Sequence, residues 1–196
     1  MQVEITQLLC SRTIGFTERK FMLKRIDTVF LAKWQKEYYE RDDREAYTNR
    51  IKKDTLTSED IKFLLEWKST RFKKKIKGKL TSPEIVKKIN ALRKKKTFGE
   101  TEVDEFVKMF YPGYPNQAPV LGTFIKHLIK PDEFPLYDQY VHEAYHDLMG
   151  VVKRADCLIV CYKDYSAFFM EIQKKLQCSS KKLDEALWAY GYSLAS

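Results

Sequence analysis

Residues 131–146, PDEFPLYDQYVHEAYH, lead from the end of one expected helix into the start of the next, and they decide how the chain is interpreted. Two chemistries fit them. The first uses the pattern His142-Glu143-x-x-His146, in which two imidazoles one helical turn apart could bind zinc while Glu143 acts as a general base. The second uses Asp138, whose carboxylate lies just ahead of a helix and behind a Pro-x-Tyr approach.

The zinc interpretation has the correct spacing but unfavourable surroundings. The apolar stripe of the expected helix faces inward, which puts His142 and His146 on the polar flank of that helix. A catalytic zinc site also needs a third protein ligand, and Asp164 and Glu171 can be nominated only by elimination. We therefore expect a solvated histidine pair, no metal and no other cofactor. A zinc hydrolase is the least favoured of the alternatives.

The positive charge of the chain is concentrated in one segment. The net charge is +9, and residues 71–96 hold 12 lysines and arginines with a single acid, Glu84. Apolar residues keep helical spacing through this segment, so the basic side chains form a folded surface. Such a surface binds a phosphate backbone by releasing counterions, although a solvated face that aids solubility is the alternative. The expected backbone contacts are Arg71, Lys73, Lys74, Lys75, Lys77, Lys94, Lys95 and Lys96.

Helical patterns cover most of the chain. With 196 residues and 44% hydrophobic side chains, the protein is large enough for a packed interior, in which Trp67 and Trp188 are expected. The absence of internal repeats and low-complexity linkers predicts one all-α domain over residues 1–196, with a soft boundary between two helical lobes near 97–101. Capping signals and apolar spacing predict helices over 17–39, 57–72, from Ser82, from Thr101, and over 122–130, 139–149, 164–177 and 180–190.

Targeting signals are not visible in the sequence. No stretch resembles a signal peptide or a membrane-spanning segment, and no C-x-x-C pattern occurs. The four cysteines therefore indicate reduced thiols. These features predict a cytoplasmic protein, nucleoid-associated if bacterial, with no membrane partner. They make no prediction of the oligomeric state.

An unusual loop, YPGYPNQ at residues 111–117, lies between two of the expected helices. Its two prolines and one glycine fix a tight turn. The helix that follows ends in KPDEFPLYD, which brings the chain to Asp138 at the start of a third helix. This order resembles the helix-hairpin-helix DNA glycosylase superfamily, especially bacterial members similar to 8-oxoguanine glycosylases. The segments EWKSTRF and LDEALWAYG also look like those relatives, so the resemblance spans about residues 57–192.

The resemblance implies a two-lobed helical fold, binding to double-stranded DNA and a role in DNA repair. It implies that the hairpin contacts the DNA backbone at Gly113, that Gln117 occupies the position of the lysine nucleophile, and that Asp138 occupies that of the aspartate. Glutamine cannot form a Schiff base, which predicts a monofunctional N-glycosylase that hydrolyses the base–sugar bond with water. Pro115 replaces a hairpin glycine and removes a backbone N–H, which favours the alternative of a non-catalytic nucleic-acid-binding module.

Asp138 has the residue type that this chemistry needs. Positive charge develops on the sugar during base–sugar cleavage, and a carboxylate stabilises that charge and orients the attacking water. Aspartate is also a strong helix N-cap, and the two roles are compatible. A flipped nucleotide needs aromatic faces, for which Tyr114, Tyr137 and Tyr140 are candidates, although tyrosines beside a helical core also serve as packing residues. Gln117 is a candidate contact to the base or the backbone, or an ordinary loop residue.

Overall fold

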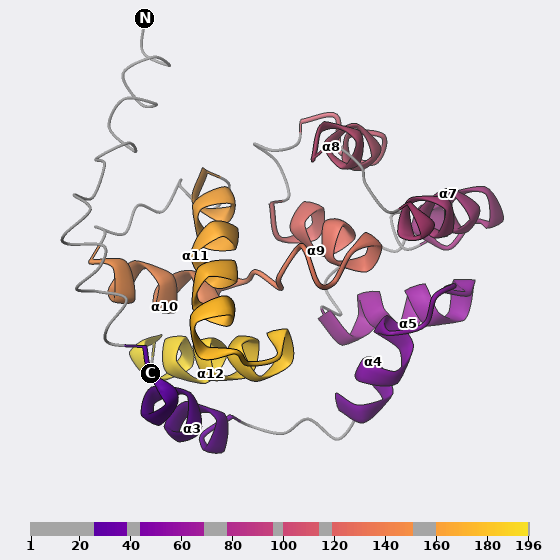
Figure 1. The fold of residues 1–196 in the computed structure, drawn as a ribbon. Coiled ribbons are helices and arrows are strands. Elements are labelled where there is room, and N and C mark those ends of the chain that lie inside the picture. Colours follow the sequence, from indigo (N-terminus) through magenta and orange to yellow (C-terminus); the bar gives the residue numbers. More distant parts are fainter. Residues whose placement is uncertain are drawn as a thin grey trace, which may run out of the picture. The chain divides into compact units, whose positions relative to one another are not determined.

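The computed structural model describes residues 26–38, 44–68, 78–95, 100–113, 119–150 and 160–195. Every regular element within these ranges is an α-helix, which confirms the expected all-α fold (Figure 1). No helix in the described ranges is long and apolar enough to cross a membrane. Contacts divide the chain into two compact units, residues 1–38 with 137–196 and residues 39–136. Residues 97–101 belong to the second unit, and the lobe boundary expected there remains a prediction.

The first unit is built around its last helix. Its described helices are α3 (Thr28–Lys36), α10 (Gln139–Met149), α11 (Val160–Leu176) and α12 (Ser180–Ala195). Helix α12 contacts each of the other three. Many of the buried side chains in this unit are aromatic, among them Tyr137, Tyr145, Tyr165, Phe168 and Phe169.

A glycine permits the closest contact in this unit. A Cβ atom built on Gly191 of α12 would lie 1.8 Å from the carbonyl oxygen of Tyr140 and 3.2 Å from the backbone nitrogen of Ala144, both in α10. Real Cβ atoms essentially never come this close to backbone atoms, so a larger residue could not be accommodated without displacing α10. The contact therefore fixes the start of α10, where Asp138 lies.

The second unit contains α4 (Arg44–Ile51), α5 (Ser58–Lys68), α7 (Pro83–Lys94), α8 (Glu100–Lys108) and α9 (Pro119–Ile129). Helix α9 packs against α7 and α8, and α5 packs against α4 and α7. The core includes Ile125, Leu128 and Ile129 of α9, all with 0% of their surface exposed. Partly buried Trp67 packs against this core, as expected, and its ring stacks on Tyr47 at 3.9 Å between centroids.

Several predicted helix ends are confirmed. Thr57 and Asp60 form a reciprocal capping box at the start of α5: the Thr57 N–H donates to Asp60 Oδ2 at 3.0 Å, and the Asp60 N–H donates to Thr57 Oγ1 at 3.1 Å. Helix α7 begins at Pro83. Helix α10 is followed by Gly150 in the left-handed conformation, with φ 61°. Each of these signals is local in sequence.

The long helix expected over residues 17–39 is wrong in its described part. Asp27 has an extended backbone, with φ −125° and ψ −173°, and its Oδ1 accepts a hydrogen bond from the Phe30 N–H at 2.8 Å. Asp27 therefore caps a new helix, α3, that starts at Thr28. Helix α4 was not predicted, because only two of its described side chains, Tyr47 and Ile51, are buried and its apolar pattern is weak.

Candidate functional site

Asp138 is the N-cap of α10. Its backbone is extended, with φ −149° and ψ −173°, and its Oδ1 accepts hydrogen bonds from the N–H groups of Tyr140 at 3.0 Å and Val141 at 3.1 Å. These bonds fix the direction of the carboxylate at the positive end of the helix dipole. The side chain is half-buried. The arrangement gives an oriented negative charge that retains contact with solvent.

Tyrosines and histidines next to Asp138 form a buried cluster. Tyr137 is 1% exposed, and its hydroxyl lies 2.7 Å from Nδ1 of His142. His142 and His146 are each 4% exposed, with ring centroids 4.2 Å apart. The expectation of a solvated histidine pair is therefore wrong. Both α11 and α12 pack on α10, so its buried side extends beyond the apolar stripe, and the Tyr137 hydroxyl compensates the polarity of one imidazole.

This burial bears on two sequence-based expectations. A base cannot stack on the ring of Tyr137 while that ring is enclosed, which argues against Tyr137 as a base contact. The nominated third zinc ligands, Asp164 and Glu171, are exposed on α11, whereas the two histidines are buried. Across the described residues no group of three His, Cys, Asp or Glu side chains is placed to hold a metal ion.

Tyr165 is a further buried phenol in this cluster. It has 0% exposure, and its ring centroid lies 4.9 Å from that of Tyr137. Burial raises the pKa of Tyr165 well above its ordinary value, and the negative charges of Asp184 and Asp138 act in the same direction. The Tyr165 hydroxyl therefore keeps its proton at neutral pH. Among the described residues this hydroxyl has no hydrogen-bond partner.

Four half-buried or exposed aromatic side chains of the first unit contact one another, and we call them the aromatic surface: Tyr38, Tyr140, Trp188 and Tyr192. The Tyr140 ring meets Trp188 at 5.1 Å and Tyr192 at 5.2 Å, both edge to face. Trp188 stacks on Tyr192 at 5.3 Å with 6° between the ring planes, and Tyr38 contacts Trp188 at 5.4 Å. Tyr192 is 50% exposed. The surface begins two residues after Asp138.

Sequence reasoning found only part of the aromatic surface. Tyr140, a predicted base contact, is half-buried. Trp188 was expected in the core but is also half-buried. Tyr192 was missed, although Trp188 and Tyr192 are four residues apart and so share one face of a helix. That spacing was the signal available in the sequence.

The described end of the basic segment contains two kinds of side chain. Lys94 and Lys95 are exposed at the end of α7, and Lys95 forms an ion pair with Glu102. Arg93 instead points into the fold. Its guanidinium donates to the carbonyl oxygens of Ile51 at 2.9 Å, Lys53 and Leu128.

Burial lowers the pKa of Arg93, and the carboxylates of Asp54 and Asp132 oppose this effect. Arg93 thus joins the ends of α4 and α9 to α7. It belongs to the core of the second unit rather than to a surface that could bind phosphate.

The other predicted contacts lie in or next to parts of the chain that the structure does not describe. Gly113 is half-buried in the turn after α8, at the end of the described residues that precede the expected hairpin tip. Its contact with DNA backbone remains a prediction. Of the residues named for the predicted site, those outside the described ranges are Arg71, Lys73, Lys74, Lys75, Lys77, Lys96, Tyr114, Pro115 and Gln117.

Comparisons with protein-family models, curated proteins and solved structures find no match to this chain. The resemblance to helix-hairpin-helix DNA glycosylases therefore depends on the motif residues alone. The described residues add three chemical features: an oriented carboxylate at Asp138, accessible aromatic rings in the same unit, and a lysine-rich helix in the other unit.

Proposed function

We propose that this protein binds double-stranded DNA and acts as a monofunctional N-glycosylase, with Asp138 as its catalytic carboxylate. One observation carries the proposal: the carboxylate of Asp138 is half-exposed and held in a fixed direction by two backbone N–H groups. A charge that is oriented before the reaction begins can stabilise a cationic transition state without further reorganisation.

The proposed reaction uses this carboxylate and needs no lysine nucleophile. The bond between the sugar carbon and the base nitrogen breaks, and its electron pair leaves with the base. Positive charge develops on the sugar, where the Asp138 carboxylate stabilises it. Water forms the new carbon–oxygen bond, and Asp138 orients that water and accepts its proton. No Schiff base forms, because Gln117 stands where a lysine would be needed.

Recognition of the extruded base is assigned to the aromatic surface. A nucleotide must leave the duplex before its base–sugar bond can be reached, and aromatic rings stabilise the unstacked base. The backbone N–H of Tyr140 donates to Asp138 Oδ1 at 3.0 Å, so the aromatic surface includes a residue that is hydrogen-bonded to the carboxylate. Trp188 and Tyr192 extend the same aromatic area from α12. A base that stacks there would be close to Asp138.

The test is release of a base from DNA. Purified full-length protein is incubated with a series of duplexes, each with one modified base, and with the unmodified duplex as control. Free base is detected by chromatography, and the abasic site by alkaline strand cleavage. We expect release from at least one modified duplex and none from the control. Tight binding with no release from any duplex would contradict the glycosylase assignment.

A non-catalytic nucleic-acid-binding module is the second candidate. It is favoured by the geometry of Asp138, because a helix N-cap alone accounts for both of its backbone hydrogen bonds. It is also favoured by Pro115, which removes a donor from the hairpin. This candidate predicts binding to duplex DNA without release of a base from any of the duplexes.

A further inference from the structure

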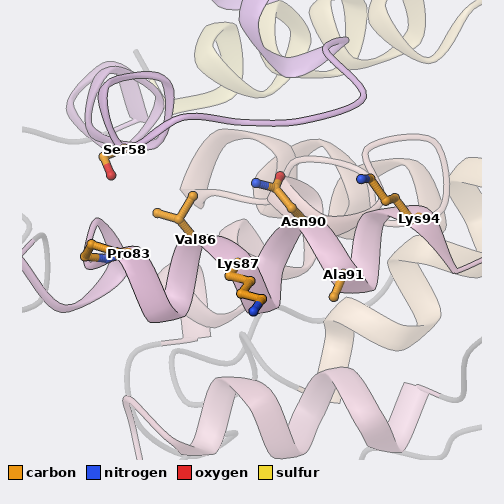
Figure 2. Close-up of a pocket in the computed structure, with 7 residues that line it drawn as sticks. All are labelled: Ser58, Pro83, Val86, Lys87, Asn90, Ala91 and Lys94. Atoms are coloured by element: carbon orange, nitrogen blue, oxygen red, sulfur yellow. The ribbon is translucent and has the colours of Figure 1, made fainter.

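An open groove of about 600 Å³ lies in the second unit, between the start of α5 and one side of α7 (Figure 2). Ser58 lines it from α5. Helix α7 contributes Val86 and Asn90, which point towards α5 in Figure 2, together with Lys87 and Lys94. None of the described lining residues is acidic.

Hydrogen bonds within the protein occupy the uncharged polar groups of this groove. Asn90 holds the backbone of Leu56 on both sides, accepting from its N–H at 2.8 Å and donating to its carbonyl oxygen at 2.8 Å. Ser58 Oγ donates to the Thr81 carbonyl oxygen at 2.9 Å. The groove therefore has a fixed shape. The groups it offers a ligand are chiefly the two lysine ammonium groups and apolar carbon.

The two lysines in the groove differ from their neighbours on α7. Lys88 pairs with Glu84 at 3.0 Å and Lys95 pairs with Glu102, whereas Lys87 and Lys94 are exposed and pair with no acid of the described residues. Seven residues separate Lys87 from Lys94, about 10 Å along the helix axis. This separation lets the two ammonium groups reach different phosphates of one strand, because the phosphates repeat along the whole length of the strand.

We propose that this groove binds the sugar–phosphate backbone of nucleic acid. Lys87 and Lys94 each contact a phosphate, and Ala91, which lies between them along α7, contacts the apolar face of a sugar. The inference depends on the proposed function, because it names the surface through which DNA is held. It also reduces the set of basic residues assigned to DNA contact. Lys87 and Lys94 contact the phosphates, whereas Arg93 stabilises the fold of the second unit.

The test compares two double variants that each remove two positive charges from the second unit. Lys87→Gln/Lys94→Gln alters the groove, and Lys62→Gln/Lys88→Gln is the matched control on α5 and α7, outside the groove. Binding of the full-length protein to a labelled duplex is followed by fluorescence anisotropy over a range of salt concentrations. We expect the groove variant to bind about tenfold more weakly.

The slope of log Kd against log salt concentration should also fall by about two for the groove variant, one for each lost phosphate contact. The slope for the control variant should change little. Circular dichroism shows whether both variants remain helical. Equal effects of the two variants would overturn the groove inference, even if base release by the wild type upholds the proposed function.

Two further outcomes would also overturn the inference. If the wild-type protein does not bind the duplex at all, both the proposed function and the groove inference are wrong. Polyglutamate that displaces the duplex as efficiently as a single-stranded oligonucleotide of equal charge would assign the groove to acidic polypeptides. We expect the oligonucleotide to compete far better, because a nucleic acid combines phosphates for the two lysines with sugars for the apolar part of the groove.

Discussion

Gly191 of α12 lies against the carbonyl oxygen of Tyr140 in α10, where a Cβ atom would come within 1.8 Å of that oxygen. Replacing Gly191 with alanine should therefore push α12 away from the first turn of α10. Overpacked sites typically lose about 1–3 kcal/mol, and a clash with backbone belongs at the upper end or above it. We expect the free energy of unfolding, measured with urea, to fall by about 3 kcal/mol.

Gly78 supplies the matched control, because a Cβ built there meets nothing within 4 Å. Gly78→Ala should leave the free energy of unfolding unchanged or raise it slightly. If both alanine variants were equally stable, the close contact between α10 and α12 would not exist as described.

The second prediction concerns His127. Its Nδ1 lies 2.8 Å from the Phe134 carbonyl oxygen and its Nε2 lies 2.7 Å from the Tyr47 hydroxyl, which fits a neutral imidazole that donates to the first and accepts from the second. Burial lowers the pKa of His127 from 6.5 to about 4. Between these two pH values the unfolded chain binds a proton that the folded chain does not, so stability falls as the pH falls.

The expected loss attributable to His127 is about 3 kcal/mol between pH 6.5 and pH 4. Urea unfolding of the wild type and of His127→Gln, measured across this window, isolates the contribution of the imidazole. The variant should be less stable at neutral pH and should lose less stability on acidification. Parallel pH profiles of the two proteins would contradict a buried neutral His127.

A third prediction follows from the carbonyl groups that Arg93 joins. Lysine keeps the positive charge but lacks the planar fork that reaches three carbonyl oxygens. Arg93→Lys should therefore reduce the free energy of unfolding by about 2–3 kcal/mol, with Lys88→Gln as a surface control close to wild type. Thermal unfolding followed by circular dichroism measures both. An Arg93→Lys variant as stable as the control would place Arg93 on the surface.

The parts of the fold that could be predicted depend on short-range chemistry. The capping box of Thr57 and Asp60, the start of α7 at Pro83 and the cap at Asp138 each involve a side chain and a backbone group within three residues. The break at Asp27 was missed because apolar spacing runs through that position. The Asp27 carboxylate accepts a hydrogen bond from the Phe30 N–H and so sets the start of α3, although the apolar spacing of the sequence continues through Asp27.

The parts of the candidate site that were missed depend on packing between distant segments. His142 and His146 are buried because α11 and α12 cover α10. Trp188 and Tyr192 become neighbours of Tyr140 through the same packing. Arg93 was counted with the basic surface because its sequence neighbours are lysines, and only the fold reveals the carbonyl groups that it contacts.

The fourth prediction concerns the covalent chemistry. A glycosylase that uses a lysine forms a Schiff base with the sugar, and borohydride reduces that intermediate to a stable adduct. Under the proposed function Gln117 stands where a lysine nucleophile would be needed, so no protein–DNA adduct should form when borohydride is present during base release. Gel electrophoresis under denaturing conditions detects such an adduct. A trapped adduct would show that another amine acts as nucleophile.

The fifth prediction separates catalysis at Asp138 from helix capping. Asparagine caps a helix about as well as aspartate but carries no charge. Asp138→Asn should therefore keep the melting temperature and the affinity for duplex DNA. Asp27→Asn, the same substitution at the N-cap of α3, is the matched control and should behave as the wild type in every assay.

The rate of base release by Asp138→Asn, measured at saturating DNA, tests the central claim most directly. If Asp138 stabilises the cationic sugar, this rate should fall by about two to three orders of magnitude relative to the wild type and to Asp27→Asn, with DNA binding intact. A rate equal to that of the wild type, with at most a lower melting temperature, would mean that Asp138 only caps α10.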